Sequence, residues 1–185
     1  MTKKYIVTGI VIVVIAIAVL LSMGRIPFCK CGVVSVWSSD VMSSEQSQQF
    51  ADPYTFTHII HGIIFYFLLW AIFRNKLTPV QRFLIAIGLE SAWEIVENTD
   101  YVINRYREAT ISLDYYGDSI FNSVGDIIAM AVGFIMAWKF PKKVTISIVV
   151  LIEFLLLYFI RDNLTINIIM LVHPIESIKN WQAGV

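Results

Sequence analysis

The sequence predicts an all-α, polytopic membrane protein: a transmembrane helix bundle of about five spanning helices with a short interfacial helix at the C-terminus. Hydrophobic residues make up 57% of the 185 residues and charged residues 15%, with a mean hydropathy of +0.71. Soluble domains contain about 45–50% apolar residues, so this composition excludes an ordinary soluble domain. The formal net charge is +0, so we expect no nucleic-acid partner. Residues 1–185 are expected to form one integral membrane domain whose main partner is the lipid bilayer.

The first span is expected at residues 5–23, directly after Lys3 and Lys4. This stretch has 19 residues and no charge, whereas the apolar core of a cleaved secretory signal has about 7–15 residues. The sequence that follows it is a poor cleavage site, so the stretch is expected to remain as a helix. Four further spans are predicted at about residues 57–73, 80–97, 120–138 and 144–160.

A sixth apolar run, residues 166–172, is too short to cross a bilayer and ends before a His-Pro pair. We expect this run to be interfacial or re-entrant. The tail that follows can form a short amphipathic helix, with Ile175, Ile178 and Trp181 on one face.

The distribution of Lys and Arg predicts the orientation of the chain, because cytoplasmic loops are enriched in these residues. Lys3 and Lys4 precede the first span, and Arg74, Lys76 and Arg82 lie around the connection between the second and third spans. Lys139, Lys142 and Lys143 lie between the fourth and fifth spans. These short segments are therefore expected on the cytoplasmic side. The resulting topology has the N-terminus inside and the C-terminus outside, with two long external loops at residues 24–56 and 98–119.

Ionisable residues gather in the outer halves of three predicted spans, although a charge at the centre of a bilayer costs about 2.5–3.5 kcal/mol. Residues spaced by three or four positions share one face of a helix, so these residues form stripes. The stripes are His58 and His61; Glu90, Glu94 and Glu97; and Asp118, Asn122 and Asp126, with Glu153 near the middle of the fifth span. Because such groups do not face lipid, they are expected to line one polar pocket that opens outward.

Three interpretations of this pocket are open. The first is a metal site for zinc or iron, since imidazole and carboxylate groups bind these metals in helical bundles. The second is acid–base chemistry without a metal, in which a histidine acts as base or nucleophile, a glutamate orients it and an arginine binds an anion. The third is a structural network of ion pairs and hydrogen bonds between helices.

The same residues serve the first two interpretations. The candidate catalytic residues, which are also the candidate metal ligands, are His58, His61, Glu94 and Glu97. The candidate substrate-binding residues are Arg105, Arg107, Asp118, Asn122 and Asp126.

The two cysteines, Cys29 and Cys31, are too few for a disulfide framework and lie in a predicted external loop, where oxidation can occur. A bridge across one intervening residue is expected to be strained. Pairing with a partner protein, metal binding and free thiols are therefore all open.

Five long motifs follow the first span: CKCG, SSEQSQQFADPYTFTHIIHG, ESAWEIVEN, INRYREATISLDYYGDSIFNSVGDIIAM and IRDNLTINIIM. Together they resemble a family of small bacterial inner-membrane proteins that is known as a domain of unknown function. The resemblance covers nearly the whole chain after the first span. It implies an integral protein of the inner membrane of a Gram-negative bacterium, with its external side in the periplasm, and no established activity.

A second set of positions is also informative: Asp52, His58, Glu94, Arg105 or Arg107, Asp118, Asn122 and Gly125. At these positions the chain is similar to the VanZ-like membrane proteins, which are associated with glycopeptide resistance. The chain departs from their pattern in its second histidine, its additional glutamates and its longer loop before Asp118. The resemblance implies an envelope-related function at the outer leaflet and no particular mechanism.

These observations predict a membrane-embedded hydrolase or transferase that acts on a lipid-linked or cell-envelope substrate. One alternative is a carrier or transporter of protons or metal ions, in which Glu153 would continue the polar path inward. Another is a non-enzymatic envelope binding or assembly protein, whose external loops would form the working surface.

Overall fold

The protein is folded entirely from helices in the part of the chain that the structure describes. The computed structural model describes residues 3–74, 76–110, 112 and 114–184. The helices are α1 (Lys3–Ser22), α2 (Thr55–Phe73), α3 (Pro79–Glu97), α4 (Asp100–Ala109), α5 (Ile120–Lys139), α6 (Lys142–Ile160), α7 (Leu164–Val172) and α8 (Glu176–Ala183). One isolated parallel bridge joins Trp37 to Ala51. The predicted all-α helical bundle is confirmed.

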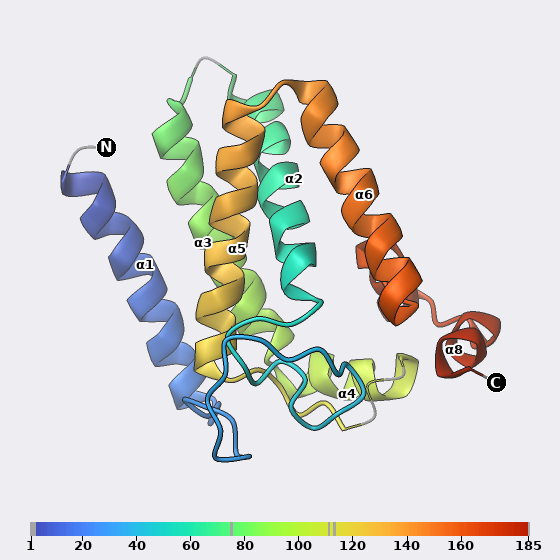
Figure 1. Ribbon diagram of the computed structural model, residues 1–185. Coiled ribbons are helices and arrows are strands. Elements are labelled where there is room, and N and C mark those ends of the chain that lie inside the picture. The colour runs from blue at the N-terminus through green and yellow to red at the C-terminus, as the bar shows by residue number, and fades with distance from the viewer. Residues whose placement is uncertain (1–2, 75, 111, 113, 185) are drawn as a thin grey trace.

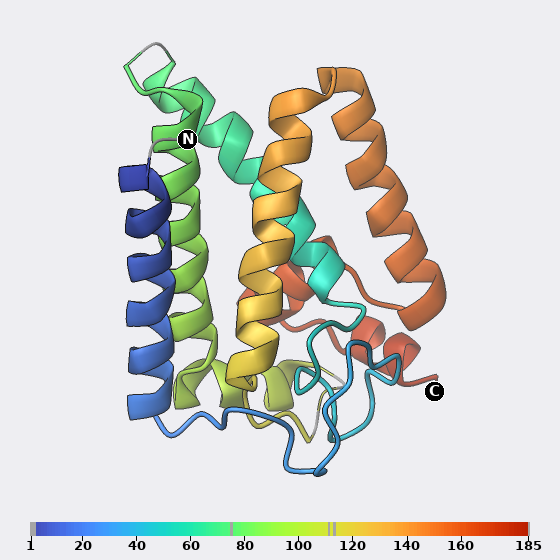
Figure 2. The same ribbon diagram turned by 60° about the vertical axis from the view of Figure 1, so that its left-hand side comes forward.

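The long helices α1, α2, α3, α5 and α6 run side by side (Figure 1, Figure 2). The N-terminus and the short α2–α3 and α5–α6 connections lie at one end of this bundle. The loops that precede α2 and α5, together with α4 and α8, lie at the opposite end, which we call the loop end. The closest packing joins α2 to α5 and α1 to α3.

Four of the long helices are long and apolar enough to cross a membrane: α1, α2, α5 and α6. This finding marks the chain as a membrane protein. The remaining long helix, α3, has 19 residues as well, but its sequence contains Arg82 and the three glutamates of the predicted stripe. It lies in the bundle beside α1 and α5 (Figure 1). That α3 also spans, as its apolar run suggested, stays a prediction.

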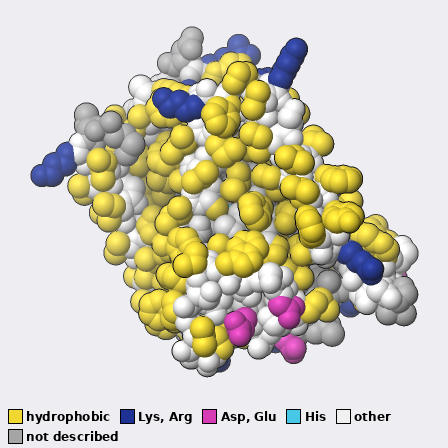
Figure 3. Space-filling view, viewed as in Figure 1, with side chains coloured by type: hydrophobic (Ala, Val, Ile, Leu, Met, Phe, Trp, Pro, Cys, Tyr) yellow, Lys and Arg dark blue, Asp and Glu magenta, His cyan; other side chains and the backbone are white. Residues whose placement is uncertain are grey.

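The surface of the bundle is apolar between its two ends (Figure 3). Large hydrophobic side chains are exposed along α1 and α6, including Ile10, Val14, Val150 and Phe154. In the view of Figure 3, Lys and Arg stand mainly at the end with the short connections, whereas Asp and Glu gather at the loop end. Exposed apolar side chains in this arrangement are typical of a surface that faces lipid.

Glycines allow α2 and α5 to touch backbone to backbone. A Cβ atom on Gly62 would lie 1.9 Å from the carbonyl oxygen of Met130. A Cβ atom on Gly133 would lie 2.0 Å from the carbonyl oxygen of Ile59. Small residues are enriched at contacts between membrane helices for this reason. The contact joins the first half of α2 to the middle of α5.

Capping side chains fix where the helices beside the candidate site begin. Thr78 accepts a hydrogen bond from the backbone of Gln81, and the Gln81 side chain accepts one from the backbone of Thr78, with Pro79 at the first turn of α3. This reciprocal arrangement satisfies two backbone donors that an isolated helix leaves free. The Ser119 hydroxyl accepts from the backbone of Asn122 at the start of α5.

The first long loop is folded onto the beginning of α5. The Gln48 side-chain amide donates to the carbonyl oxygen of Gly117 at 2.7 Å, and the Asn122 side-chain amide donates to the carbonyl oxygen of Gln49 at 2.9 Å. Both glutamines are 1% exposed, so these bonds replace water for groups buried under the loop. The loop thus covers the loop end of α5 and is not a free linker.

The C-terminal segment folds back as two short helices. The predicted short run forms α7, with 9 residues, and the predicted amphipathic tail forms α8, with 8 residues. The Glu153 carboxylate accepts hydrogen bonds from the backbone of Leu164 at 3.0 Å and of Thr165 at 3.2 Å. A carboxylate at the first turn of a helix is favourable because of the helix dipole. Glu153 therefore anchors α7 to α6.

Candidate functional site

Two histidines on α2 meet one glutamate on α3. His58 Nδ1 lies 2.5 Å from Glu90 Oε1, and His61 Nδ1 lies 3.2 Å from the same oxygen. The imidazole rings lie one helical turn apart, with their centroids 4.9 Å apart and their planes nearly perpendicular. Glu90 is fully buried. One carboxylate oxygen thus orients both imidazoles.

Two further carboxylates surround His58. Glu94 Oε1 lies 3.6 Å from His58 Nδ1, and Asp126 Oδ2 on α5 lies 3.8 Å from His58 Nε2. The helical spacing of Glu90 and Glu94 places both on the face of α3 that meets α2 and α5. We call these five residues, His58, His61, Glu90, Glu94 and Asp126, the His58 cluster.

Most carboxylate oxygens of the His58 cluster have no hydrogen-bond donor. Both oxygens of Glu94, the second oxygen of Glu90 and Oδ1 of Asp126 are buried and accept no hydrogen bond from any residue that the structure describes. No Lys or Arg of the described chain forms an ion pair with these carboxylates either, and the groups that face them are the imidazoles of His58 and His61. Burying carboxylates is costly unless a positive charge compensates for the lost water. The cluster therefore has the composition of a site that could hold a cation, either protons or a metal ion.

A cavity of about 430 Å³ opens onto the His58 cluster. His58, His61 and Asp126 reach its wall. The other polar or aromatic lining residues are Gln46, Ser47, Tyr54, Thr57, Trp93, Glu97, Tyr106, Ser112, Tyr115, Asp118 and Asn167. The aliphatic and phenyl lining comes from Phe65, Leu89, Ala92, Val96, Leu164, Ile168 and Leu171. The cavity is thus amphipathic, with walls from α2, α3, α4, α5 and α7.

Two other carboxylates of the cavity wall have their own donors. The Tyr106 hydroxyl donates to Glu97 Oε1 at 2.8 Å. Asp118 accepts from the Asn98 side-chain amide at 2.6 Å and from the Tyr115 hydroxyl at 3.0 Å. Burial raises the pKa of Asp118 to about 6, and the hydrogen bonds from Asn98 and Tyr115 limit the rise.

Asp162, which follows α6, is a buried carboxyl of the loop end. It accepts a hydrogen bond from the hydroxyl of Tyr54, a cavity residue, at 3.0 Å. Burial raises the pKa of Asp162 to about 6 as well, while bonds from the Asn163 backbone and from Tyr54 lower it.

The structure divides the predicted site residues into three groups. His58, His61, Glu94 and Asp126 lie together in the His58 cluster. Glu97 and Asp118 line the same cavity but bind tyrosine and asparagine donors. The remaining residues, Arg105, Arg107 and Asn122, do not line that cavity.

Each residue of the third group binds a backbone carbonyl instead. Arg105 Nε donates to Leu171 at 2.8 Å, which joins α4 to α7. Arg107 Nε donates to Tyr115 at 2.5 Å, which fixes the loop before α5. Asn122 donates to Gln49, as described for the first loop.

Glu90 is the cluster residue that the candidate list lacks. Its spacing of four from Glu94 places it in the predicted stripe, and that spacing was the signal that could have added it to the list. Asn167 and Leu171 of α7 carry no such signal, because the fold-back of the C-terminal segment brings them to the cavity.

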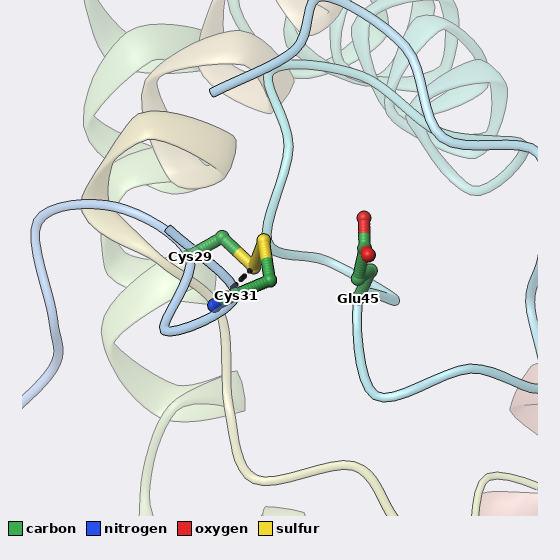
Figure 4. Close-up of side chains that lie close together, drawn as sticks. All are labelled: Cys29, Cys31 and Glu45. Atoms are coloured by element: carbon green, nitrogen blue, oxygen red, sulfur yellow. Dashed lines mark hydrogen bonds between the residues drawn. A yellow bond between two sulfur atoms is a disulfide. The ribbon is translucent and has the colours of Figure 1, made fainter. Parts of the chain in front are cut away.

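The cysteines form a disulfide, Cys29 to Cys31, with Glu45 close by (Figure 4). The backbone of Cys31 also donates to Cys29 Sγ at 3.2 Å. Of the alternatives that the sequence left open, the structure shows the bridge across one residue. Because metals bind cysteine as the thiolate, the bridged pair does not supply metal ligands.

The chain was compared with known proteins. A family model described as "Protein of unknown function (DUF2585)" matches residues 20–184. The UPF0314 protein of Paracoccus denitrificans is 49% identical over 173 residues, which cover 94% of this chain and 89% of the relative. UPF0314 proteins of Sinorhizobium fredii and Rhizobium meliloti are 52% and 51% identical, over 92% and 93% of this chain and 87% and 88% of the relatives. No solved structure matches the chain.

Proposed function

Because the chain belongs to the DUF2585 family, whose description names no function, we propose a function from the site itself: a membrane-embedded hydrolase or transferase that acts on a lipid-linked envelope substrate. The observation that carries this proposal is the amphipathic cavity. Its apolar wall suits an acyl or prenyl chain, and its polar end holds the His58 cluster. A substrate that is part lipid and part polar fits both walls at once.

His61 is the proposed general base. It lines the cavity, and its Nδ1 faces the Glu90 carboxylate at 3.2 Å. An Nδ1–H that donates to Glu90 leaves Nε2 free to accept a proton. In the proposed reaction Nε2 takes a proton from water or from an acceptor hydroxyl, and the freed oxygen attacks the ester or phosphoester. The bond to the leaving oxygen breaks, and that oxygen receives the proton from His61.

We place the protein in the cell inner membrane with the cavity at the periplasmic face. On the face seen in Figure 3, Lys and Arg stand mainly at the end with the short connections, and cytoplasmic segments are enriched in these residues. The cavity lies at the opposite, loop end. The resemblance to VanZ-like proteins rests on the sequence positions alone, since the comparisons do not show it, and it suggests an envelope substrate at the outer leaflet without a particular reaction.

The carrier alternative receives less support. It requires Glu153 to continue a polar path through the bundle, but the Glu153 carboxylate binds the first turn of α7. Substitution of Glu153 by Leu is therefore expected to act through the position of α7.

The proposal is tested in a bacterial strain that lacks the gene for this protein. Envelope lipids labelled with ³²P and with ¹⁴C-acetate are separated after expression of the wild type, His61→Ala or His173→Ala. His173 is the matched control because it is exposed and follows α7. We expect one lipid-linked species to accumulate without the protein and with His61→Ala, and to be cleared by the wild type and by His173→Ala. Clearance by a membrane-inserted His61→Ala protein would refute the assignment.

A further inference from the structure

We infer that the His58 cluster binds one divalent transition-metal ion of the zinc class, with His58, Glu94 and Asp126 as its protein ligands. This inference deepens the proposed function, because it names a cofactor for the same site. It stands on the geometry of the cluster, and its test does not require any activity.

The distances around His58 are those of ligands that share a metal ion. A tetrahedral metal with bonds of about 2.0–2.2 Å holds its ligand atoms about 3.3–3.6 Å apart. The Asp126 oxygen lies 3.8 Å from His58 Nε2, slightly above that range, and the Glu94 oxygen lies 3.6 Å from the other ring nitrogen, Nδ1. One ligand atom from each of the three residues lies within 4.8 Å of the others. These separations exceed a hydrogen bond, so small side-chain adjustments suffice to enclose an ion.

Glu94 supplies an independent observation. Its side chain is fully buried, yet neither carboxylate oxygen has a hydrogen-bond donor among the residues that the structure describes. Asp126 Oδ1 is also buried and also has no hydrogen-bond donor among these residues. Buried polar atoms are nearly always paired. Two buried carboxylates with free oxygens on either side of an imidazole therefore indicate a cationic ligand.

In this site Glu90 would not bind the metal but would hold the ligand His58 in place through a hydrogen bond. Its oxygen lies 2.5 Å from His58 Nδ1, which is a direct hydrogen bond. Histidines that bind metals commonly donate their second ring N–H to a carboxylate, which fixes the tautomer and the ring orientation. With Nδ1 engaged by Glu90, Nε2 is the His58 nitrogen that remains for the metal, on the side of Asp126.

The three ligands leave the ion open toward the cavity. His58 and Asp126 both reach the cavity wall, whereas Glu94 lies behind it. Catalytic zinc sites have this composition, with three protein ligands and an open position for water or substrate. A metal there would supply Lewis acidity next to His61.

This ligand set differs from the one that the sequence predicts. His61 and Glu97 were candidate ligands together with His58 and Glu94. His61 faces Glu90 at 3.2 Å, and Glu97 is engaged by Tyr106. Asp126 takes their place because the α2–α5 contact brings it to His58.

The test measures metals in the purified full-length protein by elemental mass spectrometry, as isolated and after incubation with Zn²⁺ and removal of unbound ion. The wild type is expected to hold about one ion per chain, as three protein ligands require. In Glu94→Gln and Asp126→Asn the bound metal per chain is expected to fall at least about tenfold, since each substitution removes a ligand. Glu97→Gln is the matched control, because it is a glutamate on the same helix and in the same cavity, and it is expected to keep the ion.

A second measurement covers the case in which a variant does not fold. Removal of metal from the wild type with a chelator is expected to lower its thermal unfolding temperature, and Zn²⁺ is expected to restore it, because an ion bound to the native state stabilises that state. Full metal content in both ligand variants, equal loss in Glu97→Gln, or no stoichiometric metal after Zn²⁺, Mn²⁺, Fe²⁺ and Co²⁺ have been offered would overturn the inference. The two proposals can fail separately. If the protein binds one ion but His61→Ala leaves the lipid profile unchanged, the proposed enzymatic function is refuted and the proposed metal site is not.

Discussion

Carboxylates that line one cavity wall and carboxylates in and behind it at the His58 cluster differ in what surrounds their oxygens. Glu97 and Asp118 face fixed donors, namely Tyr106 for the first and Asn98 and Tyr115 for the second. Glu94 lies on the same helix face as Glu97, but neither of its oxygens has a donor in the described part of the chain. A fixed donor compensates permanently for the hydrogen bonds to water that a buried oxygen has lost. For a buried oxygen without such a donor, that loss is compensated only by a cation, which can bind and dissociate. The first pair therefore holds the loop end together, and the His58 cluster is the part that we propose for binding and chemistry.

The largest expected effect comes from the contact that joins the helices of the His58 cluster. Gly62→Ala places a Cβ atom against the backbone of Met130, so α2 and α5 must separate. We expect a loss of about 1–3 kcal/mol of stability and a loss of metal, measured by thermal unfolding in detergent and by elemental analysis. Gly88→Ala is the control, because a Cβ atom there meets no described atom within 4 Å. Equal stability of the two variants would contradict the close contact.

The next effect compares the carboxylates directly. Asp118→Ala leaves the donors of Asn98 and Tyr115 unpaired, so we expect a loss of about 1–3 kcal/mol in chemical unfolding. Glu94→Gln removes no hydrogen bond from a donor that the structure describes, so the metal-free protein is expected to change by less than about 1 kcal/mol. A larger loss of stability in Glu94→Gln than in Asp118→Ala would contradict the distinction between carboxylates with and without fixed donors.

The pH dependence of stability gives a smaller and more specific effect. The pKa of Asp118 is about 6 in the folded protein, against 3.8 for an ordinary Asp. The folded state therefore binds the proton more tightly, and this contribution to stability is full below pH about 4 and lost as the pH rises through about 6. Asp118→Asn removes the titration, so its unfolding temperature relative to the wild type should rise between pH 4 and 6 and stay level above. A constant difference across that range would show that Asp118 does not titrate there.

Asp162 has its pKa raised in the same direction, to about 6. It remains in the Asp118→Asn variant, so the stability of that variant should retain part of the pH dependence. Asp162→Asn added to Asp118→Asn is expected to flatten the profile further.

The smallest effect is expected at Arg105. Its guanidinium joins α4 to a backbone carbonyl of α7 and does not line the cavity. Arg105→Gln is expected to lose about 1 kcal/mol of stability or less, with metal content and the lipid profile unchanged. Loss of lipid processing in a stable Arg105→Gln protein would restore the anion-binding role that the sequence predicts for this residue.

Much of this picture follows from periodicity alone. The length of the apolar runs predicts the long helices, and the spacing of His58, His61, Glu90 and Glu94 predicts which side chains share a face. The hydrogen-bond partners of the predicted site residues do not follow from periodicity. Arg105 binds a backbone carbonyl far along the chain, and Arg107 binds one in the next loop. Glu97, at the end of α3, accepts from Tyr106 of the following helix α4. These contacts depend on how the loops fold, for which a single sequence carries no periodic signal.

The composition of α3 has a consequence for how the chain enters a membrane. Helices are inserted in the order of synthesis, so α1 and α2 precede α3. Both are apolar enough to insert by themselves, and α3, with Arg82 and its three glutamates, is not. In the folded protein α3 packs on α1, and its buried glutamates Glu90 and Glu94 face His58 of α2. If α3 spans the membrane as predicted, its insertion is therefore expected to be a cooperative step, in which the two earlier helices supply the surface and the imidazoles that this helix requires.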